Sequence, residues 1–131
     1  MAGSSATLHE DPERLSSKTI DRHRAIVSIM EELEAIDWYD QRLEATCDPE
    51  LKEILRHNRD EEKEHAAMTL EWLRRNDPKL DEHLRTYLFT QKPVLEIEEQ
   101  AESKEGSDRD HGDDLREGLG IGSLKECRTH E

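Results

Sequence analysis

The chain of 131 residues is acidic, with 33 Asp and Glu against 19 Lys and Arg and a formal net charge of −14 at pH 7. Nucleic acid and anionic membranes bind clustered cationic side chains, so this charge argues against both as partners and suits the attraction of cations. Only 32% of the residues are hydrophobic and 4% aromatic, which is too little for one chain to enclose a large core. We expect a small all-α domain with tails, whose apolar stripes are covered by a second copy of the chain.

Three Asp-Pro pairs, at Asp11, Asp48 and Asp77, divide the chain after ten small or polar residues that we expect to be disordered. An aspartate N-cap before a proline at the first helical position is typical of a helix start, so the pairs predict three helices. The start of the first helix is ambiguous, because Ser16 and Ser17 are also suitable caps.

The first predicted helix ends near Ala45, and the second extends from about Pro49 to Arg75. Residues 46–48 are the whole connection between them, and so short a connection predicts an antiparallel hairpin. A shorter third helix is expected over about 78–89. Its apolar side fits a cap over the hairpin and a contact with a second subunit equally well.

Glu62 and His65 form a Glu-x-x-His motif on one side of the second predicted helix. They belong to a stripe of alternating four- and three-residue steps that is typical of a buried helix side. The other members of this stripe are Leu51, Leu55, Asn58, Thr69 and Trp72. A carboxylate on such a side must be paired or bind a metal ion. The motif alone is a weak signal, because surface helices often contain it by chance.

The first helix strengthens the metal hypothesis, because Glu32 lies there in a run that includes Ile29, Ile36 and Tyr39. Glu32 and the Glu-x-x-His motif form half of the ligand set of a ferritin-like di-iron bundle. Two copies about a twofold axis would supply the whole set, with both Glu62 residues as bridging ligands. Carboxylates with one imidazole per metal ion favour iron or manganese over zinc, and oxidation of Fe(II) by O₂ is the reaction that such a centre favours.

The other residues near these ligands are open to more than one interpretation. Tyr39 is an outer ligand or hydrogen-bond partner, or equally a tyrosine at the core edge with its hydroxyl in solvent. Glu31 and Glu34 fit an ordinary solvated surface. Across a twofold axis they would also gather with Trp38 into an acidic mouth that collects Fe(II), where calcium or another divalent cation is a further candidate.

The C-terminal part divides into a flexible acidic linker at 96–117 and a tail at 118–131. From Gly118 to Leu124 glycine alternates with Leu and Ile, which excludes a helix and indicates an extended docking peptide. The alternative is a tail without function.

The two cysteines, Cys47 and Cys127, form no spaced metal or redox motif, so a structural disulfide is not expected. The chain contains no apolar run of the length that a signal peptide or a membrane span needs. We therefore expect a cytosolic protein.

Several of these stretches resemble the encapsulated ferritins. The most specific are 24–39, with the run Glu-Glu-Leu-Glu-Ala-Ile-Asp-Trp-Tyr, and 57–72, with the Glu-x-x-His motif. Residues 85–90 are similar as well, and 119–124 resemble the targeting peptide that loads cargo into encapsulin shells. The resemblance implies that 11–95 form a helical hairpin domain with a short third helix, which dimerises into a ferritin-like four-helix bundle.

The resemblance also implies a function. Glu32, Glu62 and His65 would be ligands of a di-iron ferroxidase centre shared between two subunits, with Tyr39 close by. The access region by that similarity consists of Glu31, Glu34 and Trp38. Dimers would assemble into a ring of ten chains that oxidises iron but cannot store it, and an encapsulin shell, bound through 119–125, would hold the mineral. The residues alone leave one alternative, a non-catalytic acidic metal-binding adaptor or cargo protein.

Overall fold

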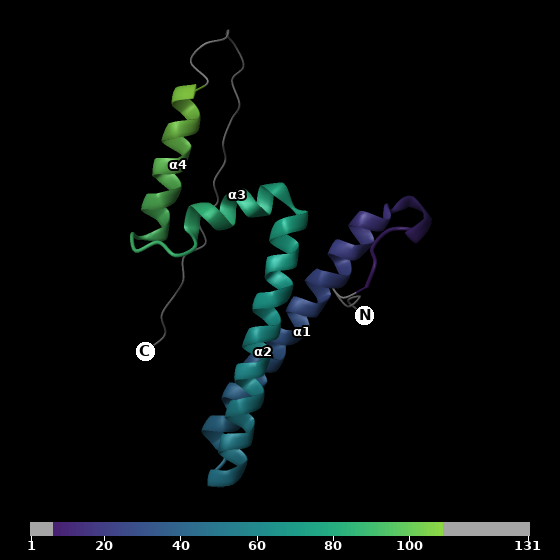
Figure 1. Ribbon diagram of the computed structural model, residues 1–131, viewed down its shortest axis with the longest axis vertical. Helices are drawn as coiled ribbons and strands as arrows, with labels where there is room; N and C mark the ends of the chain where they lie inside the picture. Colours follow the sequence, from purple (N-terminus) through teal and green to yellow (C-terminus); the bar gives the residue numbers. More distant parts are fainter. Residues whose placement is uncertain (1–6, 109–131) are drawn as a thin grey trace, which may run out of the picture. The chain divides into compact units, whose positions relative to one another are not determined.

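The computed structural model describes residues 7–108. Within this range the chain contains helices and no strand, so the all-α prediction is confirmed for the described part. It divides into two compact units between Thr90 and Gln91. The elements of the first unit are η1 (Pro12–Arg14), α1 (Ser17–Ala45), α2 (Pro49–Asn76) and α3 (Pro78–Tyr87), and that of the second is α4 (Val94–Asp108) (Figure 1). The expectations for 1–6 and 109–131, which include the docking peptide and Cys127, lie outside the described residues.

Side-chain caps begin each helix of the first unit. Ser16 Oγ accepts a hydrogen bond from the Thr19 backbone N–H at 3.2 Å and so begins α1, while Asp11 caps the short η1. The carboxylates of Asp48 and Asp77 each accept a bond from the backbone N–H three residues later, at 2.8 and 3.1 Å. A proline follows each of these two aspartates, as the sequence predicts.

α1 and α2 form an antiparallel hairpin that is closed at the 46–48 turn and diverges toward the other end (Figure 1). Its buried side chains are few: Ala25 and Leu43 of α1 and Leu73 of α2. One ion pair outside the predicted metal cluster also crosses the seam, between Arg59 of α2 and Asp40 of α1 at 3.0 Å. Two helices alone have no interior, so the seam is thin.

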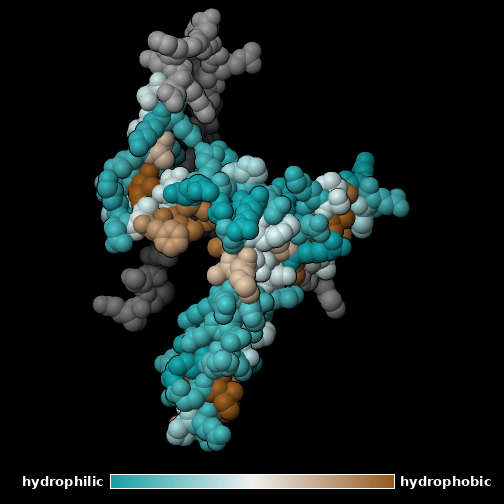
Figure 2. Space-filling view, in the orientation of Figure 1, coloured by the Kyte–Doolittle hydropathy of each residue, from teal (hydrophilic) through white to brown (hydrophobic). Residues whose placement is uncertain are grey.

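Many apolar side chains of the hairpin therefore stay uncovered in one chain. The large ones on α1 and α2 are Ile26, Met30, Leu33, Trp38, Leu51, Ile54, Met68 and Trp72. Leu51 and Trp72 belong to the stripe that the sequence analysis places inward, yet they are 45% and 40% exposed. The face in view in Figure 2 is mostly hydrophilic, with separate apolar spots. The hairpin is thus shielded on the side where its helices meet and open elsewhere.

The corner between α2 and α3 is held by charged side chains. Asp77 is the single residue between the helices, and it is both the C-cap of α2 and the N-cap of α3. Arg74 donates from Nε and Nη2 to the two carboxylate oxygens of Glu71, at 2.6 Å each, and from Nη1 to Asp81 on α3. Arg85 donates to the same Asp81 at 2.9 Å. The hydrogen bonds from Arg74 hold the pKa of Glu71 at about 2.

Helix α3 ends earlier than the sequence predicts, at Tyr87 rather than near Phe89. The Leu88 backbone N–H still donates to the Leu84 carbonyl at 2.9 Å, and Phe89 then adopts a φ of 60°. This left-handed conformation is common one residue past a helix C-cap, where it stops the helix, although glycine is its usual occupant.

Helix α4 differs from the expected flexible linker, because residues 94–108 are helical. The Pro93 carbonyl accepts hydrogen bonds from the backbone N–H groups of Glu96 and Ile97, at 3.1 and 3.2 Å. Gln100 donates to Glu96 one turn away at 3.3 Å. Five Glu residues, with one Gln, one Ala and one Lys, favour a helix in this segment. No helix in the described range has the length and apolar character needed to cross a lipid bilayer.

Candidate metal centre

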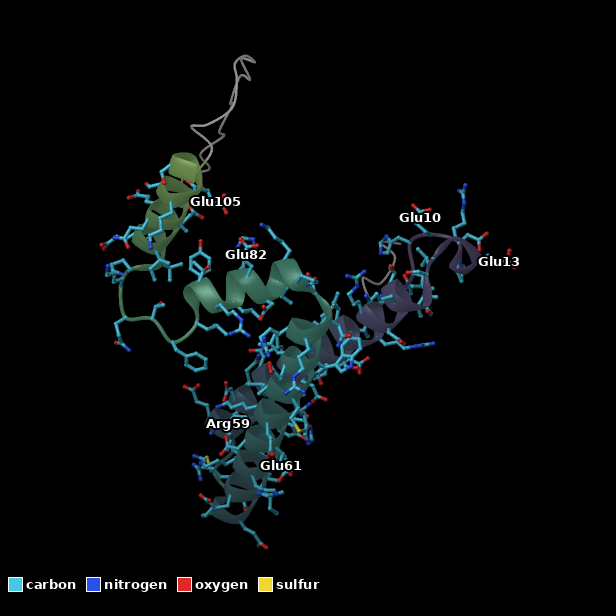
Figure 3. All side chains as sticks on the ribbon, turned by 45° about the horizontal axis from the view of Figure 1, so that its top comes forward. Glu10, Glu13, Arg59, Glu61, Glu82 and Glu105 are labelled. Carbon is cyan, nitrogen blue, oxygen red and sulfur yellow. The ribbon has the colours of Figure 1, made fainter. Side chains whose placement is uncertain are left out.

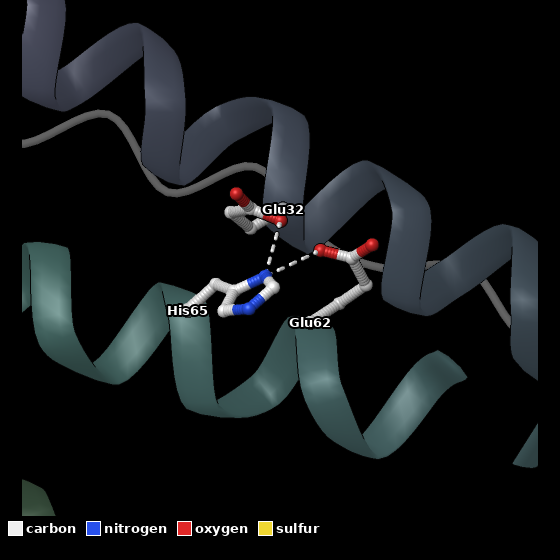
Figure 4. Close-up of side chains that lie close together, drawn as sticks. All are labelled: Glu32, Glu62 and His65. Carbon is white, nitrogen blue, oxygen red and sulfur yellow. Dashed lines mark hydrogen bonds and ion pairs between the residues drawn. The ribbon is translucent and has the colours of Figure 1, made fainter. Parts of the chain in front are cut away.

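Glu32 of α1 and the Glu62 and His65 pair of α2 meet across the hairpin seam (Figure 4). His65 Nδ1 lies 3.2 Å from Glu62 Oε2 and 3.9 Å from Glu32 Oε2. One ligand atom from each side chain lies within 4.8 Å of the other two. Among residues 7–108 this is the group of three that meets such a criterion, and it consists of the residues that the sequence analysis selects.

The two helices shield the members of the cluster unequally. The carboxylates of Glu32 and Glu62 are 25% and 24% exposed, whereas the His65 imidazole is 44% exposed. The Thr69 hydroxyl donates to the His65 carbonyl at 3.1 Å and continues the same helix side. The cluster is therefore partly closed by the seam and partly open to solvent.

The two carboxyl groups of the cluster shift each other's pKa in opposite directions. A hydrogen bond with Glu62 raises the pKa of Glu32, and partial burial and the charge of Glu62 add to the rise. The same hydrogen bond lowers the pKa of Glu62, and His65 lowers it further. Two carboxylates this close repel each other when both are ionised, which favours the protonated form of one of them. A cation at the cluster would offset this repulsion.

The donor set fits a transition-metal ion. Two carboxylate oxygens and one imidazole nitrogen are suited to iron or manganese, and this set lacks the thiolates of closed structural zinc sites. A set of three such ligands leaves coordination positions open, as in the non-haem iron sites that react with O₂. The Nδ1 atom of His65 faces both carboxylates, so metal binding requires the tautomer with its hydrogen on Nε2.

The remaining predicted site residues lie around the cluster rather than within it. The rings of Tyr39 and Trp38 contact the Arg42 guanidinium, whose central carbon is 5.6 and 6.0 Å from the two ring centroids. Glu31 and Glu34 are exposed on α1. The charge of Glu31 contributes to the raised pKa of the adjacent cluster carboxyl. The predicted roles of these four residues stay predictions.

Arg59 is not among the residues predicted from the sequence, although its side chain is as shielded as the cluster carboxylates, at 23% exposed. It lies three residues before Glu62 and therefore on the same side of α2. The three-residue spacing from Glu62 could have drawn attention to Arg59 in the sequence. Its partner Asp40 is evident only in the structure, where the hairpin brings α1 beside α2.

The fold and the cluster together are typical of the di-metal carboxylate class of helical proteins. The chain has an antiparallel helical hairpin with one Glu on the first helix and Glu-x-x-His on the second, and these residues are half of the ligand set of such a bundle.

A family model described as EncFtn-like matches residues 7–91, and the chain belongs to this family. It is 62% identical over 133 residues to an encapsulated ferritin-like protein of Rhodospirillum rubrum, covering 95% of this chain and 92% of the relative. It is 41% identical over 59 residues to the encapsulin nanocompartment cargo protein EncC of Myxococcus xanthus, covering 45% of each. A crystal structure of a protein from Nitrosomonas europaea is similar, with a TM-score of 0.65 and 61% identity, over 66% of this chain and 96% of that chain. The resemblance to encapsulated ferritins and the ferritin-like helical fold are confirmed.

Proposed function

We propose that the protein is a ferroxidase, which oxidises Fe(II) to Fe(III) with O₂ at a di-iron site shared between two subunits. The observation that carries the proposal is the convergence of Glu32, Glu62 and His65 across the hairpin seam, with ligand atoms within 4.8 Å of one another. Membership of a ferritin-like family supports iron as the metal.

The need for a second subunit follows from what one chain lacks. A di-iron bundle uses four helices and twice the ligand set that this hairpin carries. Uncovered apolar residues occur near the cluster on both helices: Met30 and Leu33 lie close to Glu32 along α1, and Met68 follows His65 by three residues on α2. A twin hairpin docked over the cluster would cover them and bring the matching three ligands. Further assembly of such dimers into a ring of ten chains belongs to the same proposal.

Fe(II) is the substrate at this site, and the residues have distinct tasks. Glu62 would hold both ions of a di-iron pair, and Glu32 and His65 would complete the ligands at each end. Fe(II) would compete with a proton for Glu32, because the carboxyl group of Glu62 raises the pKa of Glu32. Hard carboxylate oxygens favour Fe(III) over Fe(II), which drives the oxidation. Each Fe(II) gives up one electron, so an adjacent pair of irons supplies two electrons to one O₂.

Delivery into a protein shell is the second part of the proposal. The relatives are named an encapsulated ferritin-like protein and an encapsulin cargo protein, which supports an encapsulin shell as partner and location. The peptide at 119–125 would bind the shell, and the acidic mouth of Glu31, Glu34 and Trp38 would collect Fe(II) or hold calcium.

Deletion of 118–131 should abolish co-purification with a co-expressed encapsulin and leave iron oxidation unchanged. Retained co-purification would exclude this segment as the docking peptide.

The ferroxidase proposal is tested by mixing protein and Fe(II) under argon and then adding oxygenated buffer. O₂ consumption is followed with an electrode and Fe(III) by absorbance. Glu62→Gln and His65→Ala should reduce the initial rate to that of Fe(II) without protein. Glu61→Gln is the matched control, because Glu61 is an exposed neighbour, labelled in Figure 3, that pairs with His57. Metal binding without O₂ consumption in the unsubstituted protein would refute the ferroxidase and favour the acidic adaptor.

A further inference from the structure

Arg59 is a partly shielded cation on the same helix side as the metal cluster, and its guanidinium is held by two aspartates. Figure 3 labels it on the hairpin, toward the 46–48 turn. Its Nη1 donates to Asp40 Oδ1 of α1 at 3.0 Å, and its Nε donates to Asp60 Oδ1 at 3.1 Å. These bonds raise the pKa of a group that is already always charged, so Arg59 is a permanent cation.

Without these bonds Glu62 is a natural partner for Arg59. The two residues are three positions apart, where helical Cβ atoms are about 5–6 Å from each other. Helical side chains lean toward the N-terminus, so the Glu62 side chain leans over the turn that contains Arg59. A pair with the cation three residues before the acid does form elsewhere in this chain, between Lys79 and Glu82 at 2.9 Å.

Asp40 draws the guanidinium in the opposite direction. Along α1 it lies eight residues after Glu32, roughly 12 Å closer to the hairpin turn at 1.5 Å per residue. An arginine bonded to Asp40 is therefore directed toward the turn and away from the cluster. Asp60 fixes the Nε edge of the same guanidinium and leaves it less freedom to rotate.

We propose that Asp40 is a positioning residue that keeps Arg59 away from Glu62 and so leaves the Glu62 carboxylate free to bind a metal ion. A guanidinium on Glu62 would occupy its oxygens and neutralise its charge, and it would compete with the cation for the same atoms. The inference rests on the proposed metal binding at Glu62. It adds that this binding depends on Asp40, the α1 residue that contacts Arg59.

The test measures Fe²⁺ affinity under argon by isothermal titration calorimetry, at one protein concentration, with the dimer fraction checked by analytical ultracentrifugation. Asp40→Asn should weaken binding by about two- to fivefold, the range expected for one competing ion pair. Arg59→Gln should bind at least as tightly as the unsubstituted protein. In the double variant, Arg59→Gln should restore the affinity lost in Asp40→Asn, because no cation is left to compete. Asp37→Asn is the matched control, since Asp37 accepts a hydrogen bond from Gln41 on the same helix.

A purely structural role for the ion pair gives a different pattern. If Asp40→Asn, Arg59→Gln and the double variant all weaken binding alike, the pair only holds the hairpin together and the inference is wrong. Unchanged affinity in Asp40→Asn also overturns it. The Glu62→Gln variant distinguishes a failure of the positioning role from a failure of the metal site itself. If it abolishes Fe²⁺ binding while Asp40→Asn does not weaken it, the metal site stands and only the positioning role falls. If Glu62→Gln binds Fe²⁺ as the unsubstituted protein does, the site and the inference fall together.

Discussion

Replacement of Leu73 by alanine measures how much stability the seam of a single hairpin supplies. Leu73 is 5% exposed, the lowest value among the buried apolar residues of α1 and α2. Truncation of a buried leucine costs about 2–5 kcal/mol, and the cost is smallest where neighbours can close the cavity. The seam is one layer thick, so we expect the lower part of the range, about 2–3 kcal/mol. For a domain of this size that lowers the midpoint of thermal unfolding by roughly 8–20 °C.

The loss is measured by circular dichroism at 222 nm during heating and urea titration. Leu51→Ala is the matched control, because it is the same substitution on the same helix at a position that is 45% exposed, and it should cost about 1 kcal/mol or less. Both variants are measured at several protein concentrations. Equal losses for the two variants would refute the reasoning, since stability would then come from contacts between subunits rather than from the seam.

Three further predictions concern pH and assembly. Fe²⁺ affinity should fall as the pH is lowered toward the raised pKa of Glu32, because the proton and the metal ion compete for one carboxyl group. Titration calorimetry at several pH values checks this, and Glu32→Gln should make the affinity less dependent on pH. Glu71 has a folded pKa of about 2 against an ordinary 4.5, so its stabilising contribution is present above about 4.5 and is lost as the pH falls toward 2. Urea midpoints of the protein and of Glu71→Gln should therefore converge in acid; a constant difference would exclude this linkage. Fe²⁺ at a hundred times its dissociation constant should tighten dimerisation by about 100-fold for each ion that only the dimer binds, and so by about 10,000-fold for a di-iron pair; sedimentation experiments measure this, and Leu33→Glu should prevent dimerisation.

The helix starts follow from the sequence because caps are local. Asp48 and Asp77 carry the whole signal in the residue and the proline after it. Ser16 and Asp11 compete within one turn, and the structure uses both, one for α1 and one for η1. Helix α4 is not predicted from the sequence, because the apolar period that indicates a packed helix ends before it. A stripe reports packing, whereas helix propensity and a start after Pro93 need no packing partner.

The three members of the metal cluster are also predictable, because helical spacing fixes which side chains share a side and the short turn fixes which helices meet. The extent to which their side chains are shielded from solvent is not predictable. His65 and Leu51 lie on a stripe that reads as buried, yet each is more than 40% exposed in one chain. A stripe does not say whether its cover comes from the same chain or from another. The contact of Asp40 with Arg59 is not predictable from the sequence either, because it joins residues 19 positions apart.

The shared aspartate at residue 77 limits how the length of this chain can vary. One extra residue inserted after Arg74 in the last turn of α2 would rotate α3 by about 100° around the α2 axis, because a helix turns once in 3.6 residues. The Asp81 carboxylate would then no longer meet the Arg74 guanidinium. The connection at 46–48 and the segment after Leu88 have non-helical residues that can absorb such a change. We therefore expect natural length variants of this hairpin to differ at those two places and to keep the spacing across the corner.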